Sequence, residues 1–568
     1  MTFKKLVLFL IFFVCQFALA QNDSIQYLEE VKVSDSQLKN FSNSQSVQKL
    51  SDSIINKNQA SLTSLLNYNT VIYFKENGLG MVSSPSFRGT TAQQTAVIWN
   101  GININSQLLG QTDFNTLSTR DFKNITVRAG GGSSLYGSSA IGGSIHLNNE
   151  LDFSNKFTNE IRVNYGSFNT YGVNYKVDVS DEKFSFQASI SRNESDNDYE
   201  FVDYNAKNIN GEYYNTSLNT TFGYKINSNN YLKFYSQFFD GERHFSVIFP
   251  SEVKTKYRDF NTRNMLEWSS FIGKFTSKVK FARLTEKYKY FANIASDSHT
   301  FGEVKTYIGK YDLAFDVNQN IKLNTVIDFT QNSGNGSDIK NEKRNIGSAS
   351  LLLKHKVTNI FLYEASVRKE ITSNYKSPLL FSLGTNFAFT DFYTLKLNGS
   401  KNFRVPTFND LYWQPGGNEN LKPESSYQAE LGNDFHFKNF KFTLTGYIID
   451  IDDMLRWVPM GGVWTPENTN KVKTYGAEVL LNWSKTFGKN KFALNGTYAY
   501  TVSENAETKK QLIYVPFHKA TSSLAYSYRK FSADYQFLYN GEVFTRSDNN
   551  SKYNLDAYFV SNASIAYD

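Results

Sequence analysis

From residue 151 onward, apolar and polar residues alternate along the chain in runs of about ten residues. In the run KFALNGTYAY, at 491–500, aromatic and aliphatic side chains fall on one face and small or polar ones on the other. Similar runs are GVNYKVDVS at 172–180, KFTLTGYIID at 441–450 and FSADYQFLYN at 531–540. Strands of soluble proteins average about five or six residues, whereas tilted membrane-spanning strands need about ten. The pattern therefore predicts many amphipathic strands of membrane-spanning length.

Such strands must close on themselves, because lipid offers no hydrogen-bond partner to a free backbone group. Residues 151–568 have room for roughly twenty or more strands, and a barrel that wide needs a plug in its lumen. A soluble sandwich or propeller does not explain the strand length, the scarcity of proline, or the Tyr and Phe side chains on the apolar face. We expect an all-β transmembrane barrel of roughly 20–22 antiparallel strands, with an N-terminal α+β plug domain inside it.

The first 150 residues have a different pattern. Residues 1–20 carry two lysines, a short apolar core and an Ala-Leu-Ala end, which is typical of a cleaved signal peptide rather than of a membrane anchor. Residues 21–50 form a polar leader. Residues 51–150 predict a compact α+β domain. It has a short helix over 51–72 and strands over 83–89, 95–104, 122–130 and 142–147.

Composition narrows the class of protein further. Cys15 is the only cysteine and lies in the signal peptide, so the mature chain has no disulfide and no thiolate metal site. Removing Lys4 and Lys5 lowers the net charge from +7 by two, to +5, which does not indicate nucleic-acid binding. The mean hydropathy is −0.45, yet the chain has 48 Phe and 36 Tyr. This combination fits a barrel, because alternating apolar and polar residues cancel in a hydropathy average.

A Gly- and Ser-rich stretch, SSLYGSSAIGGSIHL at 133–147, fits no phosphate-binding spacing. Together with FRG at 87–89 and WNG at 99–101, it follows the order of motifs in the plug of TonB-dependent outer-membrane receptors, which the chain resembles over nearly its whole length. Asn100 stands where that family prefers Asp, and Ala129-Gly130 replaces Gly-Pro. Barrel segments that also resemble the family are NFRVPTFNDLY (402–412), GNENLKPESSYQAELG (417–432), KTYGAEVLLNW (473–483) and VPFHKATSSLAY (515–526).

The resemblance implies two sets of interacting residues. Contacts between plug and barrel are expected at Arg88, Gly89, Asn100, Gly101, Arg128, Tyr136 and Gly137. Arg88 and Arg128 either pair with carboxylates of the barrel wall or remain solvated. The leader segment LEEVKVS corresponds to the box that adds as a strand to TonB, or else is plain linker. Its residues are Leu28, Glu29, Glu30, Val31, Lys32, Val33 and Ser34.

The function implied by the resemblance is active import of a scarce, bulky nutrient across the bacterial outer membrane. Energy would come through the TonB–ExbB–ExbD complex to a monomeric, lipid-embedded barrel. Cobalamin is the expected ligand, a ferric siderophore is the alternative, and a passive porin or adhesin is less favoured. Haem is disfavoured because no His lies between Arg404 and Leu421. The expected ligand contacts are Asn77, Gln107, Leu108 and Leu109.

Three further expectations concern metal, chemistry and the end of the chain. The acidic segment 193–203 offers carboxylates that calcium could use, or is a solvated loop. Those carboxylates belong to Glu194, Asp196, Asp198, Glu200 and Asp203. The six scattered histidines and the absence of a Gly-x-Ser-x-Gly motif argue against an enzyme, and no cofactor is required. The family usually ends in an aromatic residue, whereas this chain ends at Asp568, so one or two closing strands are expected to be missing.

Overall fold

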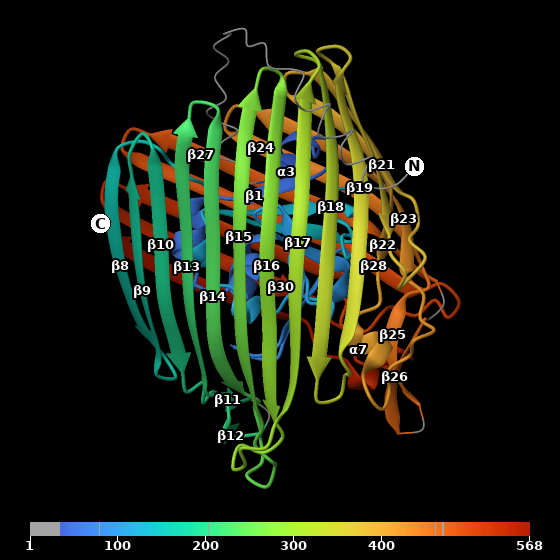
Figure 1. Cartoon of the computed structure of the whole chain (residues 1–568). Helices are drawn as coiled ribbons and strands as arrows, with labels where there is room; N and C mark the ends of the chain where they lie inside the picture. The colour runs from blue at the N-terminus through green and yellow to red at the C-terminus, as the bar shows by residue number, and fades with distance from the viewer. Residues whose placement is uncertain (1–34, 79, 203, 461, 469–470) are drawn as a thin grey trace.

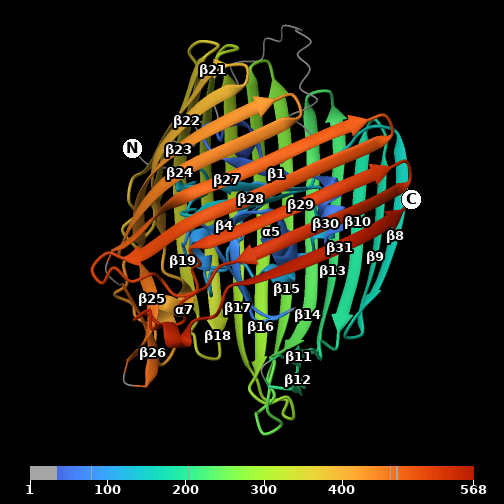
Figure 2. The ribbon, with the colours of Figure 1, turned by 180° about the vertical axis from the view of Figure 1, so that it is seen from behind.

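The structure is a computed structural model that describes residues 35–78, 80–202, 204–460, 462–468 and 471–568. A 20-stranded antiparallel barrel surrounds a smaller N-terminal plug (Figures 1 and 2), as the strand pattern predicted. Within these residues, no helix has the length and apolar character needed to cross a membrane. The signal peptide and the expected TonB-interacting segment, residues 28–34, lie outside the described residues.

The barrel strands follow one another as simple antiparallel neighbours. They are β8 (Lys156–Gly166), β9 (Thr170–Ser180), β10 (Phe184–Ser195), β13 (Tyr213–Asn227), β14 (Asn230–His244), β15 (Lys256–Ile272), β16 (Phe275–Phe291), β17 (Thr300–Asp316), β18 (Ile321–Gly336), β19 (Glu342–Lys356), β20 (Phe361–Ile371), β21 (Leu380–Thr390), β22 (Tyr393–Arg404), β23 (Glu424–Phe437), β24 (Phe440–Asp452), β27 (Val472–Phe487), β28 (Asn490–Asn505), β29 (His518–Tyr528), β30 (Phe531–Asn540) and β31 (Tyr558–Tyr567).

The two ends of the barrel differ. At one end the strands are joined by short turns, such as the two residues between β15 and β16. At the other end, lowest in Figure 1, longer loops carry their own elements. These are β11 (Glu200–Phe201), β12 (Ala206–Lys207), α7 (Phe408–Tyr412), β25 (Leu455–Met460), β26 (Val463–Asn468) and the 3₁₀ turn η4 (Ser551–Tyr553). We call these the short-turn end and the long-loop end.

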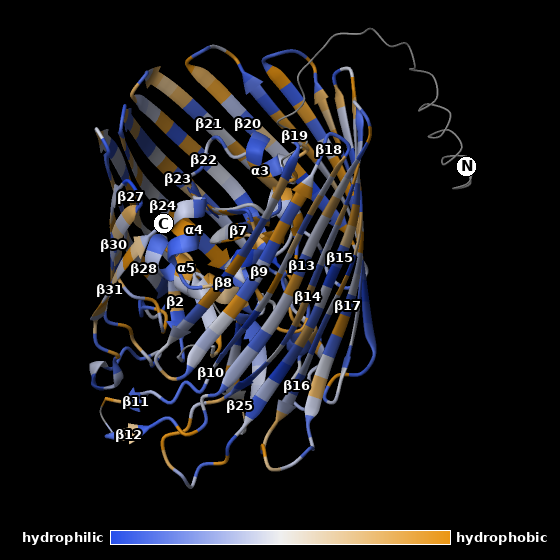
Figure 3. Cartoon of the chain, turned by 90° about the vertical axis from the view of Figure 1, so that its left-hand side faces the viewer, coloured by the Kyte–Doolittle hydropathy of each residue, from blue (hydrophilic) through white to orange (hydrophobic). Residues whose placement is uncertain are grey.

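Hydrophobic and hydrophilic residues alternate along many of the barrel strands (Figure 3). On β13, Leu218 and Phe222 are about 40% exposed on the outer face, whereas Ser217, Asn219 and Thr221 are buried toward the lumen. Strands β13 to β19 have 15 to 17 residues, more than the ten or so that the sequence pattern predicted. The extra residues are possible because paired backbone can continue past the apolar band into the loops.

The wall has one weak place, between β31 and β8. The strand order puts these two strands next to each other. Among the described residues, however, the register of β8 is with β9 and that of β31 is with β30. Nearly every residue of these two strands is exposed, including Val163 on β8 (73%) and Ile565 on β31 (77%). This seam is therefore the least covered part of the barrel.

The plug is an α+β domain centred on a five-stranded sheet with the order β1-β6-β7-β4-β5. Strands β4 and β7 pair in parallel, and the others are antiparallel. Its elements are α3 (Ser36–Asn40), β1 (Val47–Leu50), α4 (Asp52–Lys57), α5 (Leu62–Asn69), β2 (Tyr73–Glu76), β3 (Ser83–Ser86), η1 (Ala92–Gln94), β4 (Thr95–Trp99), β5 (Ile102–Asn103), η2 (Phe114–Thr116), η3 (Thr119–Asp121), β6 (Asn124–Ala129), α6 (Ser133–Tyr136) and β7 (Gly143–Asn148).

Three local predictions for this domain were wrong. The single helix over 51–72 is two helices, because Asn58 adopts extended backbone and Ser61 caps a new helix. The strand over 95–104 is a hairpin, since Asn100 and Gly101 both have positive φ, as a tight hairpin turn requires. Residues 36–50, assigned to the leader, belong to the folded plug because β1 pairs with β6.

The Gly- and Ser-rich stretch forms the short helix α6, a turn and the strand β7. Gly137 ends the helix with a φ of +79°. Gly143 begins β7 directly under the ring of Phe87 and beside the carbonyl oxygen of Arg128, so no side chain fits there. The glycines of this stretch therefore serve a sharp turn and close backbone packing.

We expect Gly143→Ala to destabilise the plug by about 1–3 kcal/mol, because the added methyl group overlaps Phe87 and protein backbone. Limited proteolysis of the purified protein measures the effect as faster cleavage of the plug with the barrel intact. Gly446→Ala is the matched control, since a methyl group there meets no atom within 4 Å. Equal protease resistance of the two variants would contradict this interpretation.

Candidate functional site

The candidate site lies at the long-loop end, around a plug loop formed by residues 104–113. Asn105 holds this loop in shape: its Oδ1 accepts from the Val97 amide (2.8 Å), and its Nδ2 donates to the carbonyls of Thr95 and Gly110 (2.9 and 3.0 Å). Ser106 ties the loop to the wall by donating to Glu286 (2.7 Å). The loop is thus a fixed ridge between two cavities, both of which are lined by Leu109 and Gln111.

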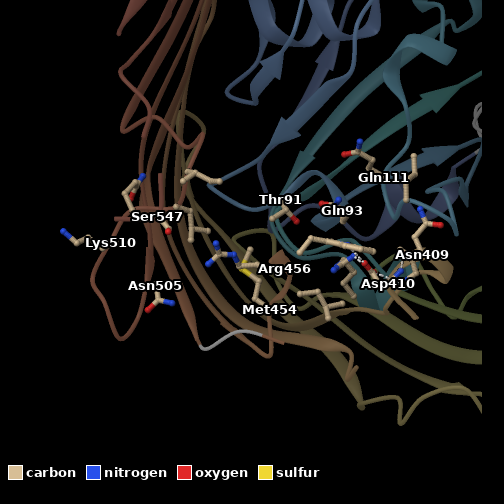
Figure 4. A pocket seen from close by; sticks show the side chains of 18 of the residues that line it. Thr91, Gln93, Gln111, Asn409, Asp410, Met454, Arg456, Asn505, Lys510 and Ser547 are labelled. Carbon is tan, nitrogen blue, oxygen red and sulfur yellow. Dashed lines mark hydrogen bonds and ion pairs between the residues drawn. The ribbon is translucent and has the colours of Figure 1, made fainter. Parts of the chain in front are cut away.

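The first cavity has a volume of about 630 Å³ and lies between the plug ridge, α7 and the loops after β24 and β28 (Figure 4). Its polar lining is rich in amides and hydroxyls, and its apolar lining is aliphatic with one indole. The amide side chains are Gln93, Gln111, Asn409, Asn505 and Gln511. The apolar side chains are Leu108, Leu109, Met454, Leu455, Trp457, Leu512 and Ile513.

The second cavity, about 590 Å³, lies on the other side of the ridge against β14, β15 and β16. Its aromatic lining includes Tyr257 and Tyr288, whose rings stack with centroids 5.1 Å apart. Arg243 pairs with Asp113 of the plug at 2.6 Å and with Asp259 of the wall at 3.4 Å. Arg243 is therefore already paired with two carboxylates, whereas Arg263 donates to Gln237 (2.8 Å) and Glu286 accepts from Ser106.

The four residues expected to bind ligand lie in different environments. Leu109 is 39% exposed and lines both cavities, and Leu108 lines the first although its own side chain is buried against Phe408. Gln107 accepts a hydrogen bond from the Phe408 amide (2.8 Å) and lines a deeper, smaller cavity. Asn77 is exposed beyond β2 and lines neither of these two cavities.

Sequence reasoning missed most of the site. Asn105 and Ser106 carry no recognisable motif, although Asn-Ser next to a hairpin is a composition that favours a tight loop. The wall residues Arg243, Asp259 and Glu286 come from separate strands, and each looks like an ordinary lumen-facing position in its own alternating pattern.

Arg88 is the strongest contact between plug and wall. Its guanidinium is buried and forms ion pairs with Glu478 (2.8 Å) and Glu430 (3.0 Å), over the ring of Tyr447. Burial opposes the positive charge, but the two carboxylates outweigh it and raise the pKa of Arg88 above its ordinary value. The alternative of a solvated arginine does not hold for this residue.

Four other expected contact residues also touch the wall. Gly89 accepts from the Ser503 hydroxyl through its carbonyl oxygen (2.9 Å). The carbonyls of Asn100 and Gly101 accept from the ammonium groups of Lys280 and Lys310, at 2.7 and 3.0 Å. Gly137 lies so close to Glu370 and Arg368 of β20 that a β-carbon would stand 3.2 Å from the Glu370 carboxylate.

Arg128 and Tyr136 differ from the expectation, because both form their hydrogen bonds inside the plug. Arg128 donates to Ser42 (3.1 Å) and to the carbonyls of Gly130 and Gly131 (3.2 and 2.9 Å), and it has no ion pair among the described residues. The Tyr136 hydroxyl lies 3.4 Å from Asp35. These two side chains point into the plug because β1 and α3, which the sequence assigned to the leader, pack there.

A buried polar cluster lies directly after the segment 28–34. His146 bonds to Asp35 through Nδ1 (2.7 Å) and to the Ser144 hydroxyl through Nε2 (2.8 Å). Burial by itself raises the pKa of Asp35, but His146, the Leu38 amide and Lys310 outweigh it and bring the pKa to about 2. This order of Ser, His and Asp resembles a catalytic triad. All three side chains are buried, and Asp35 also caps α3 by accepting from the Leu38 amide, so the cluster fastens the start of the plug.

The acidic segment 193–203 does not gather its carboxylates. Glu194 pairs with Arg192 (3.0 Å), Asp196 accepts from Asn169 (2.6 Å), and Asp198 lies 3.6 Å from Lys207. Glu200 is exposed in β11, and Asp203 is outside the described residues. Within the described ranges, no group of three or more carboxylate, histidine or cysteine side chains could hold a metal ion. The calcium site stays a prediction.

Comparison with protein families matches both domains. A model of the TonB-dependent receptor-like β-barrel matches residues 141–568, and a model of the TonB-dependent receptor plug domain matches residues 39–144. Among curated proteins, a vitamin B12 transporter BtuB of Photobacterium profundum is 22% identical over 500 residues, which cover 86% of this chain and 80% of that protein. A vitamin B12 transporter BtuB of Vibrio vulnificus is 24% identical over 423 residues, covering 71% and 67%.

Solved structures share the architecture at low sequence identity. The siderophore receptor PirA from Acinetobacter baumannii superposes with a TM-score of 0.77 at 16% identity, covering 94% of this chain and 93% of that one. The ferric yersiniabactin uptake receptor FyuA from Yersinia pestis superposes with a TM-score of 0.76 at 14% identity, covering 92% and 90%. At such identity these structures show a common fold and leave the ligand open.

We expect Arg88→Met to destabilise the docking of the plug by about 3–5 kcal/mol, because it leaves two buried carboxylates without a cation. Hydrogen exchange of the plug in the purified receptor measures the effect. Arg258→Met, which breaks the exposed Arg258–Asp240 pair, is the control and should cost about 1 kcal/mol or less. Adding Glu478→Gln should recover part of the loss in the first variant, and the absence of any such coupling would refute the assigned pairing.

Proposed function

Because the chain belongs to the TonB-dependent receptor family, whose members are transporters and receptors rather than enzymes, we propose that it imports cobalamin across the bacterial outer membrane. The proposal rests on one observation: the lining of the two cavities that share the plug ridge. That lining combines apolar surface and amide groups with balanced charge. Cobalamin is a macrocycle with apolar faces, ringed by carboxamides and close to neutral. The BtuB relatives support the same ligand class.

Charge separates cobalamin from the second candidate, a ferric siderophore. Together the two cavities present five Arg or Lys side chains and five carboxylates. A ferric catecholate carries several negative charges, and its recognition calls for a surplus of cations. Arg243 and Arg404 are also already paired with carboxylates, so they are not free to meet an anionic chelate. Because siderophore receptors are among the structural neighbours, the binding experiment also includes ferric siderophores.

We expect the purified receptor to bind cyanocobalamin tightly in titration calorimetry, and a ferric catecholate or hydroxamate weakly. Leu109→Asp should weaken cobalamin binding at least tenfold, because it places a charge on the ridge between both cavities. Val253→Asp is the control: Val253 is 61% exposed in a loop at the same end and lines neither of the two cavities.

The outcomes of the titration separate the candidates. No binding of cobalamin together with tight binding of a ferric chelate would replace the ligand and leave the transporter in place. Repeating the titration with calcium and with a chelator tests the metal prediction for segment 193–203. Binding that is unaffected by the chelator would remove calcium from the mechanism.

Segment 28–34 is proposed to reach the TonB–ExbB–ExbD complex by strand addition, where main-chain hydrogen bonds supply the affinity. Deleting residues 28–34 should abolish uptake in cells while binding by the purified protein stays unchanged. Deleting residues 22–26 of the same leader is the control and should leave uptake intact. Retained uptake after the first deletion would indicate a passive porin instead of an active importer.

A further inference from the structure

A third, deeper cavity of about 130 Å³ lies between the plug and strands β16 to β20. Its plug side is formed by residues 101–110 and 135–139. It shares Thr407 with the first outer cavity and Ser106 with the second. At its far side lies Lys310, whose ammonium also contacts Gln37 of α3, toward the short-turn end. The cavity therefore follows the plug–wall boundary inward from the ligand site.

Arg344 of β19 is the unusual side chain in this cavity. It is 1% exposed, and its one hydrogen bond in the described chain runs from Nη2 to the Pro406 carbonyl oxygen (2.8 Å). Its Nε and Nη1 have no acceptor among the residues that the structure describes. The rings of Phe408 and Tyr375 lie 5.1 and 5.8 Å from the guanidinium carbon and fix its position. A buried cation with two free donors is costly unless something accepts from it.

A second donor stands beside the first. Asn332 of β18 is directly opposite Arg344 in the strand register, and it is also 1% exposed. Its Oδ1 accepts from the Thr306 hydroxyl (2.8 Å), which leaves the Nδ2 group without an acceptor among the described residues. Opposed residues of an antiparallel pair have β-carbons about 5 Å apart. Guanidinium and amide N–H groups are thus presented to one small space.

The carboxylates of the cavity do not fill this role. Asp328 and Glu370 both pair with Arg368, at 3.1 and 3.2 Å. Glu370 also accepts from the Tyr375 hydroxyl (2.7 Å). The cavity is lined by three cations, Lys310, Arg344 and Arg368, and by these two carboxylates, so it has one positive charge in excess. Arg344 is the arginine that has no carboxylate partner in the described chain.

We propose that this cavity is an oxyanion site, in which Arg344 and Asn332 bind a phosphate or carboxylate group. Arginine N–H donors match such oxygens in geometry and charge. The volume is several times the roughly 30 Å³ of one water, which suffices for a small anionic group. The anion comes either from the ligand passing between plug and wall, which rests on the proposed function, or from free inorganic anion. Cobalamin carries one phosphodiester.

The direct test is titration of the full-length purified receptor with inorganic phosphate, followed by ³¹P NMR. The wild type should bind saturably. Arg344→Met should weaken binding at least tenfold, and Asn332→Leu, which keeps the volume and removes the donor, severalfold. Arg258→Met, which removes an arginine that does not line this cavity, should bind as the wild type does. Absence of saturable binding by the wild type, or unchanged binding by the first two variants, overturns the site.

Two further measurements keep the test decisive. Should Arg344→Met fail to fold, Arg344→Lys retains the charge without the planar fork and should bind phosphate several times more weakly. Uptake of cobalamin and of its phosphate-free analogue cobinamide then identifies the source of the anion. If Asn332→Leu slows the uptake of cobalamin but not that of cobinamide, the anion is the phosphodiester of the ligand. If the variant takes up both compounds equally well, the anion is free in solution. Phosphate binding is measured without cobalamin, so it stands even where cobalamin does not bind.

Discussion

Backbone N–H and C=O groups have no hydrogen-bond partner in hydrocarbon, and the whole architecture depends on this constraint. It requires every barrel strand to have neighbours in one continuous sheet, and it sets the alternation of apolar and polar side chains along these strands. A 20-stranded sheet encloses a lumen too wide for its own side chains to fill. The plug is the consequence, and its surface must match a wall lined with polar groups.

The wall meets the plug largely through lysine and arginine chemistry. Lys519 donates to the carbonyls of Asn67 and Thr70, at the C-terminal end of α5, where a cation is favoured by the helix dipole. Lys280 and Lys310 donate to backbone carbonyls of the β4–β5 turn in the same way. Such bonds satisfy buried backbone groups of the plug. Apolar side chains pack across the same boundary, as Trp99 does against Tyr235, and Arg88 adds two ion pairs to wall carboxylates.

The ligand site and the oxyanion site follow from the same interface. The ridge at residues 104–113 is fixed by Asn105 inside the plug and by Ser106 to the wall, so it divides the long-loop end into two cavities. Deeper in the lumen, plug and wall separate enough to leave Arg344 and Asn332 with donors that have no acceptor among the described residues. Lys280 and Lys310, by contrast, both donate to plug carbonyls.

The sequence by itself determined the barrel, the plug, their order and the family resemblance. Alternation over ten residues indicates a strand with lipid on one side. The motifs around Arg88, Gly101 and Gly137 indicate the plug domain. It could not determine which charges meet. Arg88 and Arg128 look alike in the chain, yet Arg88 reaches Glu430 and Glu478 whereas Arg128 stays within the plug. Nor could it show that Asn332 and Arg344 stand opposite each other. Partners separated by hundreds of residues are set by register and by docking of the plug, which only the tertiary structure decides.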